Sequence, residues 1–266
     1  MRFSADIFFI DKPQSNIPTN YRKDVASLLK EAVKANNPEL HNQFWGDPKA
    51  NSSKPFTFSV YLPDVQSFKG KNNNYLQISN DILNPKAGLF ISSSDPIVLI
   101  NFYNSLLNIP DYKLFGSGIE LKHFRLLQEV SFNERDALFK TMSPLIVRNM
   151  TERNDENKRD SRYLTFDDAG FEENLYHSIK RICKDFIDDS YDFTRDDFKF
   201  SPINCRIVKI HHYKEIIPAT SGTFKIEAPA EVLKLIYDAG IGARRSQGFG
   251  MVNVVKDIDG TGGGGI

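Results

Sequence analysis

The sequence predicts an α+β protein in which one strand–helix–strand–strand–helix–strand unit occurs twice in tandem. Three observations support this prediction. The chain has 266 residues, enough for two domains of ordinary size. Short runs rich in Phe and Ile alternate with longer segments whose apolar residues recur at helical spacing. The order of these segments in the first half repeats in the second, and it is the ferredoxin-like (βαββαβ, RRM-like) order.

The first half contains one full set of elements. Its opening run, Arg2 to Ile10, is rich in Phe and Ile and predicts a buried strand. The next segment carries Val25, Leu28 and Leu29 on one helical face, and Pro38 follows it closely. In chain order we expect a strand at 2–10, a helix at 19–36, strands at 56–61 and 87–92, a helix from Asp95 or Pro96 to Leu107, and a strand at 119–130.

The second half repeats the set. We expect a strand at 137–148 that runs through Ser143-Pro144, a helix at 170–187, strands at 205–210 and 215–226, a helix at 230–239 and a strand at 251–255. Residues 149–162 are polar and dense in charge, which predicts a mobile loop. The expected domains are therefore 1–131 and 132–257, followed by a flexible glycine-rich tail at 258–266.

Charge, cysteine content and the length of apolar runs limit the classes of function that fit this chain. Lys and Arg together number 34, as do Asp and Glu, so the formal net charge is zero. The charge is uneven, because residues 201–256 hold eight Lys and Arg against four Asp and Glu, a local excess of 8 − 4 = +4. A basic face on a neutral protein suits a specific RNA groove. Two distant cysteines predict neither a disulfide framework nor a zinc site. No run is long and apolar enough for a signal peptide or a membrane span, so we expect a cytoplasmic protein without membrane partners.

A glycine-rich segment near the C-terminus is the most informative feature. Two glycine pairs bracket a short basic and polar stretch, between the helix at 230–239 and the last strand. Such a loop can turn sharply and present backbone N–H groups to phosphate, and its arginines add positive charge. It is neither a dinucleotide fingerprint nor a Walker loop, because a helix precedes it and a strand follows. The expected RNA-binding residues are Gly240, Gly242, Arg244, Arg245, Ser246, Gln247, Gly248, Phe249 and Gly250.

A helix, a basic glycine loop and a final strand together resemble the C-terminal signature of the CRISPR-associated RAMP proteins. The pairs Gly240-Ile241-Gly242 and Gly248-Phe249-Gly250 are most similar to the branch that processes CRISPR repeat RNA. The double ferredoxin-like architecture extends this resemblance across nearly the whole chain. It implies a metal-independent endoribonuclease that cuts precursor CRISPR RNA within its repeats. The implied partners are the repeat transcript and the subunits of an effector complex, with the chain a monomer or a homodimer.

Cleavage of RNA without a metal needs proton transfer to and from ribose and phosphate oxygens, and histidine suits both steps. Among the five histidines, His41 is the leading candidate because it follows the first helix, in a turn-rich stretch before the Phe56 strand. The resemblance implies a catalytic histidine in this place, beside the glycine loop. His211 and His212 are consecutive on a strand and therefore point to opposite faces. No spacing of ligands predicts a dedicated metal site, and no cofactor is implied.

Three further residues are candidates for the chemistry. Lys49 and Lys54 follow His41 closely enough to supply a cation, although neither matches the lysine spacing of the resembling family. Either one is equally well explained as solvated loop charge. Tyr21 opens the first helix and could orient the histidine or the 2′-hydroxyl, while packing on Val25 is the simpler explanation. The alternative function is a non-catalytic RAMP subunit that binds guide RNA in an effector complex. A small-molecule enzyme of the same fold would need a carboxylate or metal cluster, which the sequence lacks.

Overall fold

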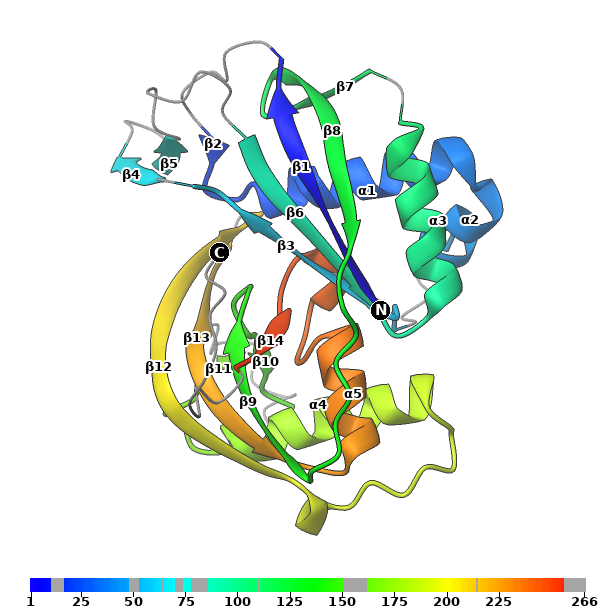
Figure 1. The fold of residues 1–266 in the computed structure, drawn as a ribbon. Coiled ribbons are helices and arrows are strands. Elements are labelled where there is room, and N and C mark those ends of the chain that lie inside the picture. Colours follow the sequence, from blue (N-terminus) through cyan, green and yellow to red (C-terminus); the bar gives the residue numbers. More distant parts are fainter. Residues whose placement is uncertain are drawn as a thin grey trace, which may run out of the picture.

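The computed structural model describes residues 1–10, 17–47, 53–63, 65–69, 74–77, 86–109, 111–150, 162–213 and 215–255. Figure 1 shows two halves, one above the other, joined by the green segment that runs down from the first half to the second. Three predictions lie outside the described residues: the flexible tail at 258–266, the mobile loop at 149–162 over all but its ends, and the position of Lys49.

The first half is a five-stranded antiparallel sheet with helices on one face. Alternate residues of the first strand, including Phe3, Ala5 and Ile7, are buried against those helices, which gives this half its own core. The sheet order is β3-β6-β1-β8-β7, so the first strand lies in the middle. In chain order the elements are β1 (Arg2–Phe9), α1 (Arg22–Asn36), β3 (Phe56–Tyr61), β6 (Lys86–Ser93), α3 (Pro96–Leu107), β7 (Tyr112–Leu114) and β8 (Ser117–Leu126).

Five short elements of the first half have no counterpart in the predicted order, and one of them is the edge strand β7. Helix α2 (Pro38–Trp45) follows α1 directly. Strands β2 (Ile17–Pro18), β4 (Gln66–Lys69) and β5 (Asn74–Gln77) form a small separate sheet in the order β2-β5-β4. These strands are two to four residues long, too short to show a period of two in the sequence.

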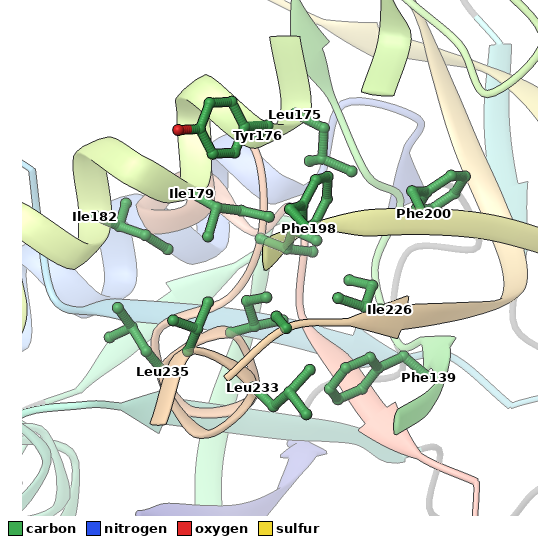
Figure 2. Packing of buried hydrophobic residues seen from close by; sticks show 14 of the residues in the cluster. Phe139, Leu175, Tyr176, Ile179, Ile182, Phe198, Phe200, Ile226, Leu233 and Leu235 are labelled. Atoms are coloured by element: carbon green, nitrogen blue, oxygen red, sulfur yellow. The ribbon is translucent and has the colours of Figure 1, made fainter. Parts of the chain in front are cut away.

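The second half forms a four-stranded antiparallel sheet in the order β12-β13-β9-β14. Helices α4 and α5 cover one face, and Figure 2 shows Leu175, Ile179 and Ile182 of α4 pointing toward Leu233 and Leu235 of α5 and the strands beneath. The elements are β9 (Asp136–Thr141), β10 (Val147–Arg148), β11 (Tyr163–Leu164), α4 (Phe171–Phe186), η2 (Arg195–Asp197), β12 (Lys199–His212), β13 (Glu215–Glu227), α5 (Ala230–Ala239), η3 (Arg245–Gln247) and β14 (Val252–Val254).

The predicted strand through Ser143-Pro144 is wrong, because the chain leaves the sheet there. β9 ends at Thr141, and the next two amides both donate to the carbonyl of Met251. Pro144 has no N–H to continue a ladder. β10 then pairs with β11 instead of with the main sheet. A second difference is the length of β12, which begins at Lys199 and ends at His212 because β13 pairs with it along nearly its full length.

Hydrogen bonds between the halves hold the glycine-rich segment against the first sheet. The hydroxyl of Thr57 on β3 donates to the carbonyl of Phe249 at 2.9 Å, and that of Ser59 donates to the carbonyl of Met142 at 2.7 Å. The Ser92 hydroxyl on β6 donates to the carbonyl of Asp238 at the end of α5. Strand β3 is therefore part of the floor of the glycine segment. None of the helices in the described ranges is both long and apolar enough to cross a membrane.

Candidate functional site

The glycine-rich loop, residues 240–250, has a backbone that only glycine adopts without strain at four positions. Gly240, Gly242, Gly248 and Gly250 all have positive φ, between 67° and 85°. A Cβ on Gly250 would lie 1.8 Å from the carbonyl oxygen of Ile241, and one on Gly248 would lie 2.6 Å from the ring of Phe58. The loop is folded back on itself, since the Ile241 amide donates to the Gly250 carbonyl at 2.9 Å.

The two arginines of the loop have different environments. Arg244 is partly exposed; it donates to the Gln247 side chain at 3.1 Å and to the Tyr163 hydroxyl at 2.8 Å. Arg245 is 7% exposed and donates to the carbonyl of Ala239, and burial lowers the pKa of its guanidinium to about 10. The sequence predicted that both arginines offer their side chains to phosphate. The structure differs from this prediction at Arg245, because its guanidinium faces inward.

Backbone amides at the start of η3 supply another set of donors. Arg244 has a left-handed conformation with φ of 59°, and the short η3 helix follows it. The amides of Arg244, Arg245 and Ser246 donate to no acceptor in the described part of the chain, while those of Gln247 and Gly248 close the helical turn. Successive unpaired amides around a left-handed residue form a concave group of donors suited to an anion.

A basic cleft of about 850 Å³ lies beside the loop. Its walls come from the loop, from β10 and α4 of the second half, and from the residues just before β3. The described residues that line it include no carboxylate, and Glu215 outside the lining pairs with Arg162 at 3.2 Å and Arg244 at 3.8 Å. The lining therefore carries an excess of positive charge, which attracts anions. The lining cations are Lys54, Arg148, Arg162, Arg181, Arg244 and Arg245.

His41 lies on a helix and not in the expected turn, and this corrects the prediction. The Asn37 side chain caps α2 by accepting the amide of Leu40 at 3.0 Å, and Pro38 occupies the first helical turn. Those two residues end α1 and start a second helix at once. The His41 ring lies 5.6 Å from the Trp45 ring, centroid to centroid, and tilted by 34°. Its Nε2 is buried without a hydrogen-bond partner among the described residues.

Lys54 connects the histidine to the basic cleft. Its ammonium lies 5.0 Å from the centroid of the Trp45 ring, and its side chain lines the cleft together with the glycine loop. Burial, and secondarily the charge of Lys30, lowers the pKa of Lys54 below its ordinary value. The structure thus brings His41 and Lys54 to one tryptophan, and Lys54 to the same cleft as Arg244.

Tyr21 occupies the N-cap of α1 and is 8% exposed. Its ring packs edge-on against Phe115 at 6.4 Å, and the Arg22 guanidinium lies 4.7 Å above it. Arg22 also donates to the carbonyl of Gly248 at 3.2 Å, so the start of α1 adjoins the glycine loop. Tyr21 is thus a packed aromatic whose ring partners are Phe115 and Arg22.

His212, Arg22 and Trp45 are site-adjacent residues that sequence reasoning missed. His212 ends β12, is 2% exposed, and lies 2.9 Å through Nε2 from the Gln247 side-chain oxygen. Its ring also packs on Phe249 at 5.1 Å. Burial lowers the pKa of His212. The alternation along β12 indicated that one of His211 and His212 faces inward, but nothing in the sequence indicated a partner in the glycine loop.

The remaining histidines lie elsewhere. His123 contacts Asp6 at 3.0 Å on the first sheet, and His177 contacts Glu173 at 3.0 Å on α4. Within the described residues, no group of three or more His, Cys, Asp or Glu converges to hold a metal ion.

Comparisons with known proteins agree with this arrangement. The family model for "CRISPR associated protein Cas6, C-terminal" matches residues 127–254, from the segment between the halves to the last strand. The CRISPR-associated endoribonuclease Cas6 1 of Methanocaldococcus jannaschii is 27% identical over 91% of this chain and 88% of its own length. The CRISPR-associated endoribonuclease Cas6 of Pyrococcus furiosus is 26% identical over 96% of this chain and 90% of its own length.

Residues 127–254 match the C-terminal domain of the CRISPR-associated Cas6 family. The sequence-based resemblance to CRISPR-associated repeat-RNA-processing RAMP proteins is thereby confirmed. The fold agrees as well. A Cas6-related protein from Pyrococcus furiosus superposes with a TM-score of 0.81 at 20% identity, over 97% of this chain and 99% of that chain. A RAMP protein binding different RNA substrates superposes with a TM-score of 0.77 at 19% identity, over 96% of this chain and all of that chain.

The Cas6 match covers the two halves unequally. The family model takes in the glycine loop and the arginines of the cleft but not His41, Trp45 or Lys54. The two Cas6 relatives span both halves. Support for the roles of His41, Trp45 and Lys54 therefore comes from their own contacts.

Proposed function

We propose that this chain is an endoribonuclease that cuts precursor CRISPR RNA within its repeats to release guide RNAs. The observation that carries the proposal is the basic cleft, because one of its cations, Lys54, contacts the tryptophan against which His41 packs. A cleft lined by cations without a described carboxylate suits a polyanion. An imidazole that shares the Trp45 ring with a cation of this cleft suits proton transfer at the bound backbone. The Cas6 endoribonucleases among its relatives support the same activity.

The proposed reaction is a transesterification that needs no metal ion. The ribose 2′-oxygen forms a bond to the adjacent phosphorus while the bond from phosphorus to the 5′-oxygen breaks. His41 carries out one of the two proton transfers, taking the proton from the 2′-hydroxyl or giving one to the departing 5′-oxygen, and solvent water carries out the other. The Lys54 ammonium stabilises the extra negative charge on the phosphoryl oxygens. Its lowered pKa reflects the same burial that strengthens its attraction for an anion. The products are a 2′,3′-cyclic phosphate and a 5′-hydroxyl.

The glycine-rich loop is the proposed holder of the RNA backbone. Arg244 is the arginine of the loop whose guanidinium is partly exposed, and we assign it a phosphate contact. The unpaired amides of Arg244, Arg245 and Ser246 extend that contact to the backbone of the loop. Buried Arg245 fixes the loop from beneath through the Ala239 carbonyl. Gly248 keeps the loop close to Phe58, which positions the whole segment.

Two candidates from the sequence keep weaker roles. Tyr21 lies beside Arg22, which bonds the loop carbonyl of Gly248, so Tyr21 supports the loop through packing. Lys49 stays a second source of cation, to be compared with Lys54 by substitution.

The finer architecture is also part of the proposal. We assign each half to a ferredoxin-like unit, with domains at 1–131 and 132–257. The sheet orders β3-β6-β1-β8 and β12-β13-β9-β14 support this, because each places the first strand of its half between the third and the fourth. A cytoplasmic protein working as a monomer or homodimer, with contacts to effector-complex subunits, completes the assignment.

The alternative, a subunit that only holds guide RNA, uses the same cleft but needs no proton carrier. The two functions separate in one experiment. Labelled repeat RNA is incubated with the protein and excess EDTA, and the products are resolved by size and end group. Cleavage with a cyclic phosphate end, and resistance of RNA carrying 2′-deoxyribose before the cut, are the expected results. Binding without cleavage would support the alternative, and magnesium dependence would exclude the proposed mechanism.

A further inference from the structure

Trp45, the only tryptophan of the chain, contacts both proposed catalytic groups at once. It ends α2, one turn after His41, so the two side chains lie on the same face of that helix. The His41 ring lies 5.6 Å from the Trp45 ring at an angle of 34°, within the range of offset aromatic stacking. The Lys54 ammonium lies 5.0 Å from the same ring, within cation–π distance.

The tryptophan is itself fixed from its other side. Its ring meets Phe44 edge-on at 5.6 Å and Phe56 at 6.4 Å, and Phe56 is a fully buried residue of the first core. A half-buried ring that is held by the core offers its remaining surface to the side chains of His41 and Lys54. Lysine has four rotatable side-chain bonds, so its ammonium needs such a contact to stay in one place.

We propose that Trp45 is the positioning residue that sets the distance between His41 and Lys54 in the cleavage reaction. The inference rests on the proposed function, because it assigns those two residues to proton transfer and to charge stabilisation. The stacked ring limits the orientations of the imidazole, and the cation–π contact keeps the ammonium on the cleft side. Such preorganisation lowers the barrier only in the transition state, so the loss of the ring slows cleavage and leaves RNA affinity nearly unchanged.

The first test uses the fluorescence of the single tryptophan. A protonated imidazole in contact with an indole quenches its emission, so the emission of the wild type is expected to change as the pH is lowered through the range in which histidines take up protons. His41→Ala is expected to remove that step, and His177→Ala, which alters a histidine on α4, is expected to leave it in place. An emission that is independent of pH, or a step that survives in His41→Ala, would overturn the contact.

The second test compares three substitutions in single-turnover cleavage with saturating protein. Trp45→Leu removes the aromatic face and is expected to slow cleavage by ~10²-fold, the size expected for a misplaced reacting group. Trp45→Phe keeps a ring and is expected to recover most of the rate. Phe102→Leu is the matched control, since buried Phe102 packs on the same core residue, Phe56, at 4.7 Å but makes no ring contact with Trp45.

The outcomes separate this inference from the proposed function. If His41→Ala cleaves at the wild-type rate, the proposed function fails, while the fluorescence step still tests the contact. If His41→Ala is inactive and Trp45→Leu cleaves normally, positioning by Trp45 is overturned. Equal losses in Trp45→Leu and Phe102→Leu, or no recovery in Trp45→Phe, would show that the ring serves only the core and would also overturn it.

Discussion

Gly248→Ala should destabilise the protein more than a glycine substitution at a comparable backbone conformation elsewhere. Gly248 has φ of +85°, and a Cβ there would lie 2.6 Å from Cε2 and 2.8 Å from Cζ of the Phe58 ring. Phe58 is fully buried in the first core and cannot turn aside without moving its neighbours. The substitution therefore carries two separate costs, one from the backbone and one from packing.

Each cost has a typical size. A non-glycine residue in the left-handed region costs ~1–2 kcal/mol. An extra methyl forced into a close-packed core costs ~1–3 kcal/mol. The sum is ~2–5 kcal/mol, which for a chain of this size lowers the melting temperature by roughly 4–20 °C. Gly170 is the matched control: its φ is +82°, but the nearest atom to an added Cβ lies at 3.6 Å. Gly170→Ala should show only the backbone cost of ~1–2 kcal/mol.

Urea denaturation of the two variants measures the difference directly. The double variant Gly248→Ala/Phe58→Leu removes the overlap, so its loss of stability should be smaller than the sum of the two single losses by ~1–3 kcal/mol. RNA binding should weaken in Gly248→Ala and recover in part in the double variant. Equal stability of Gly248→Ala and Gly170→Ala, together with additive losses in the double variant, would show that the added Cβ does not overlap with the Phe58 ring.

Three further predictions follow from the site. Arg244→Ala should weaken RNA binding and reduce the slope of log affinity against log salt by ~1, as binding curves at several salt concentrations would show. Arg245→Ala should leave that slope unchanged but lower the free energy of unfolding by ~1–3 kcal/mol, as urea titrations would show. Burial lowers the pKa of His212, so as the pH falls the unfolded chain binds the His212 proton before the folded protein does. The free energy of unfolding of the wild type should therefore decrease from about pH 6.5 downward. His212→Phe should lack that part of the loss when urea titrations at about pH 7.5 and about pH 5.5 are compared. Lys54→Met should slow single-turnover cleavage by ~10²–10³-fold with a small change in affinity, and a greater loss in Lys49→Ala would transfer the role to Lys49.

The main elements were predictable because their signals are local. The helix at 230–239 and the strand at 56–61 agree with α5 and β3 residue for residue. Both have a clear apolar period, and a proline marks one end of each. The strand through Ser143-Pro144 was wrong because its termination depends on the carbonyl of Met251, more than a hundred residues away. Helix α2 was missed because its signal, an Asn37 cap followed by Pro38, also suits a turn.

The residues of the candidate site were easier to predict from the sequence than the contacts between them. The glycine pattern predicted a loop that turns sharply, and the structure has positive φ, which glycine adopts freely, at all four positions. The burial of Arg245 could not be predicted, because it depends on the fold of α5 and on the Ala239 carbonyl. The contact of Trp45 with both His41 and Lys54 joins residues of a helix and of the segment before β3. No periodic pattern in the sequence predicts a contact between two such segments.

The most direct test of the proposed chemistry is single-turnover cleavage of repeat RNA by His41→Ala in EDTA, with RNA affinity measured in parallel. We expect near-normal affinity, because the cleft and the glycine loop do not depend on the imidazole. We expect the cleavage rate to fall by ~10²-fold or more, the size of a lost general acid or base. Cleavage by His41→Ala at the wild-type rate, with bound RNA giving the same cyclic phosphate product, would contradict it.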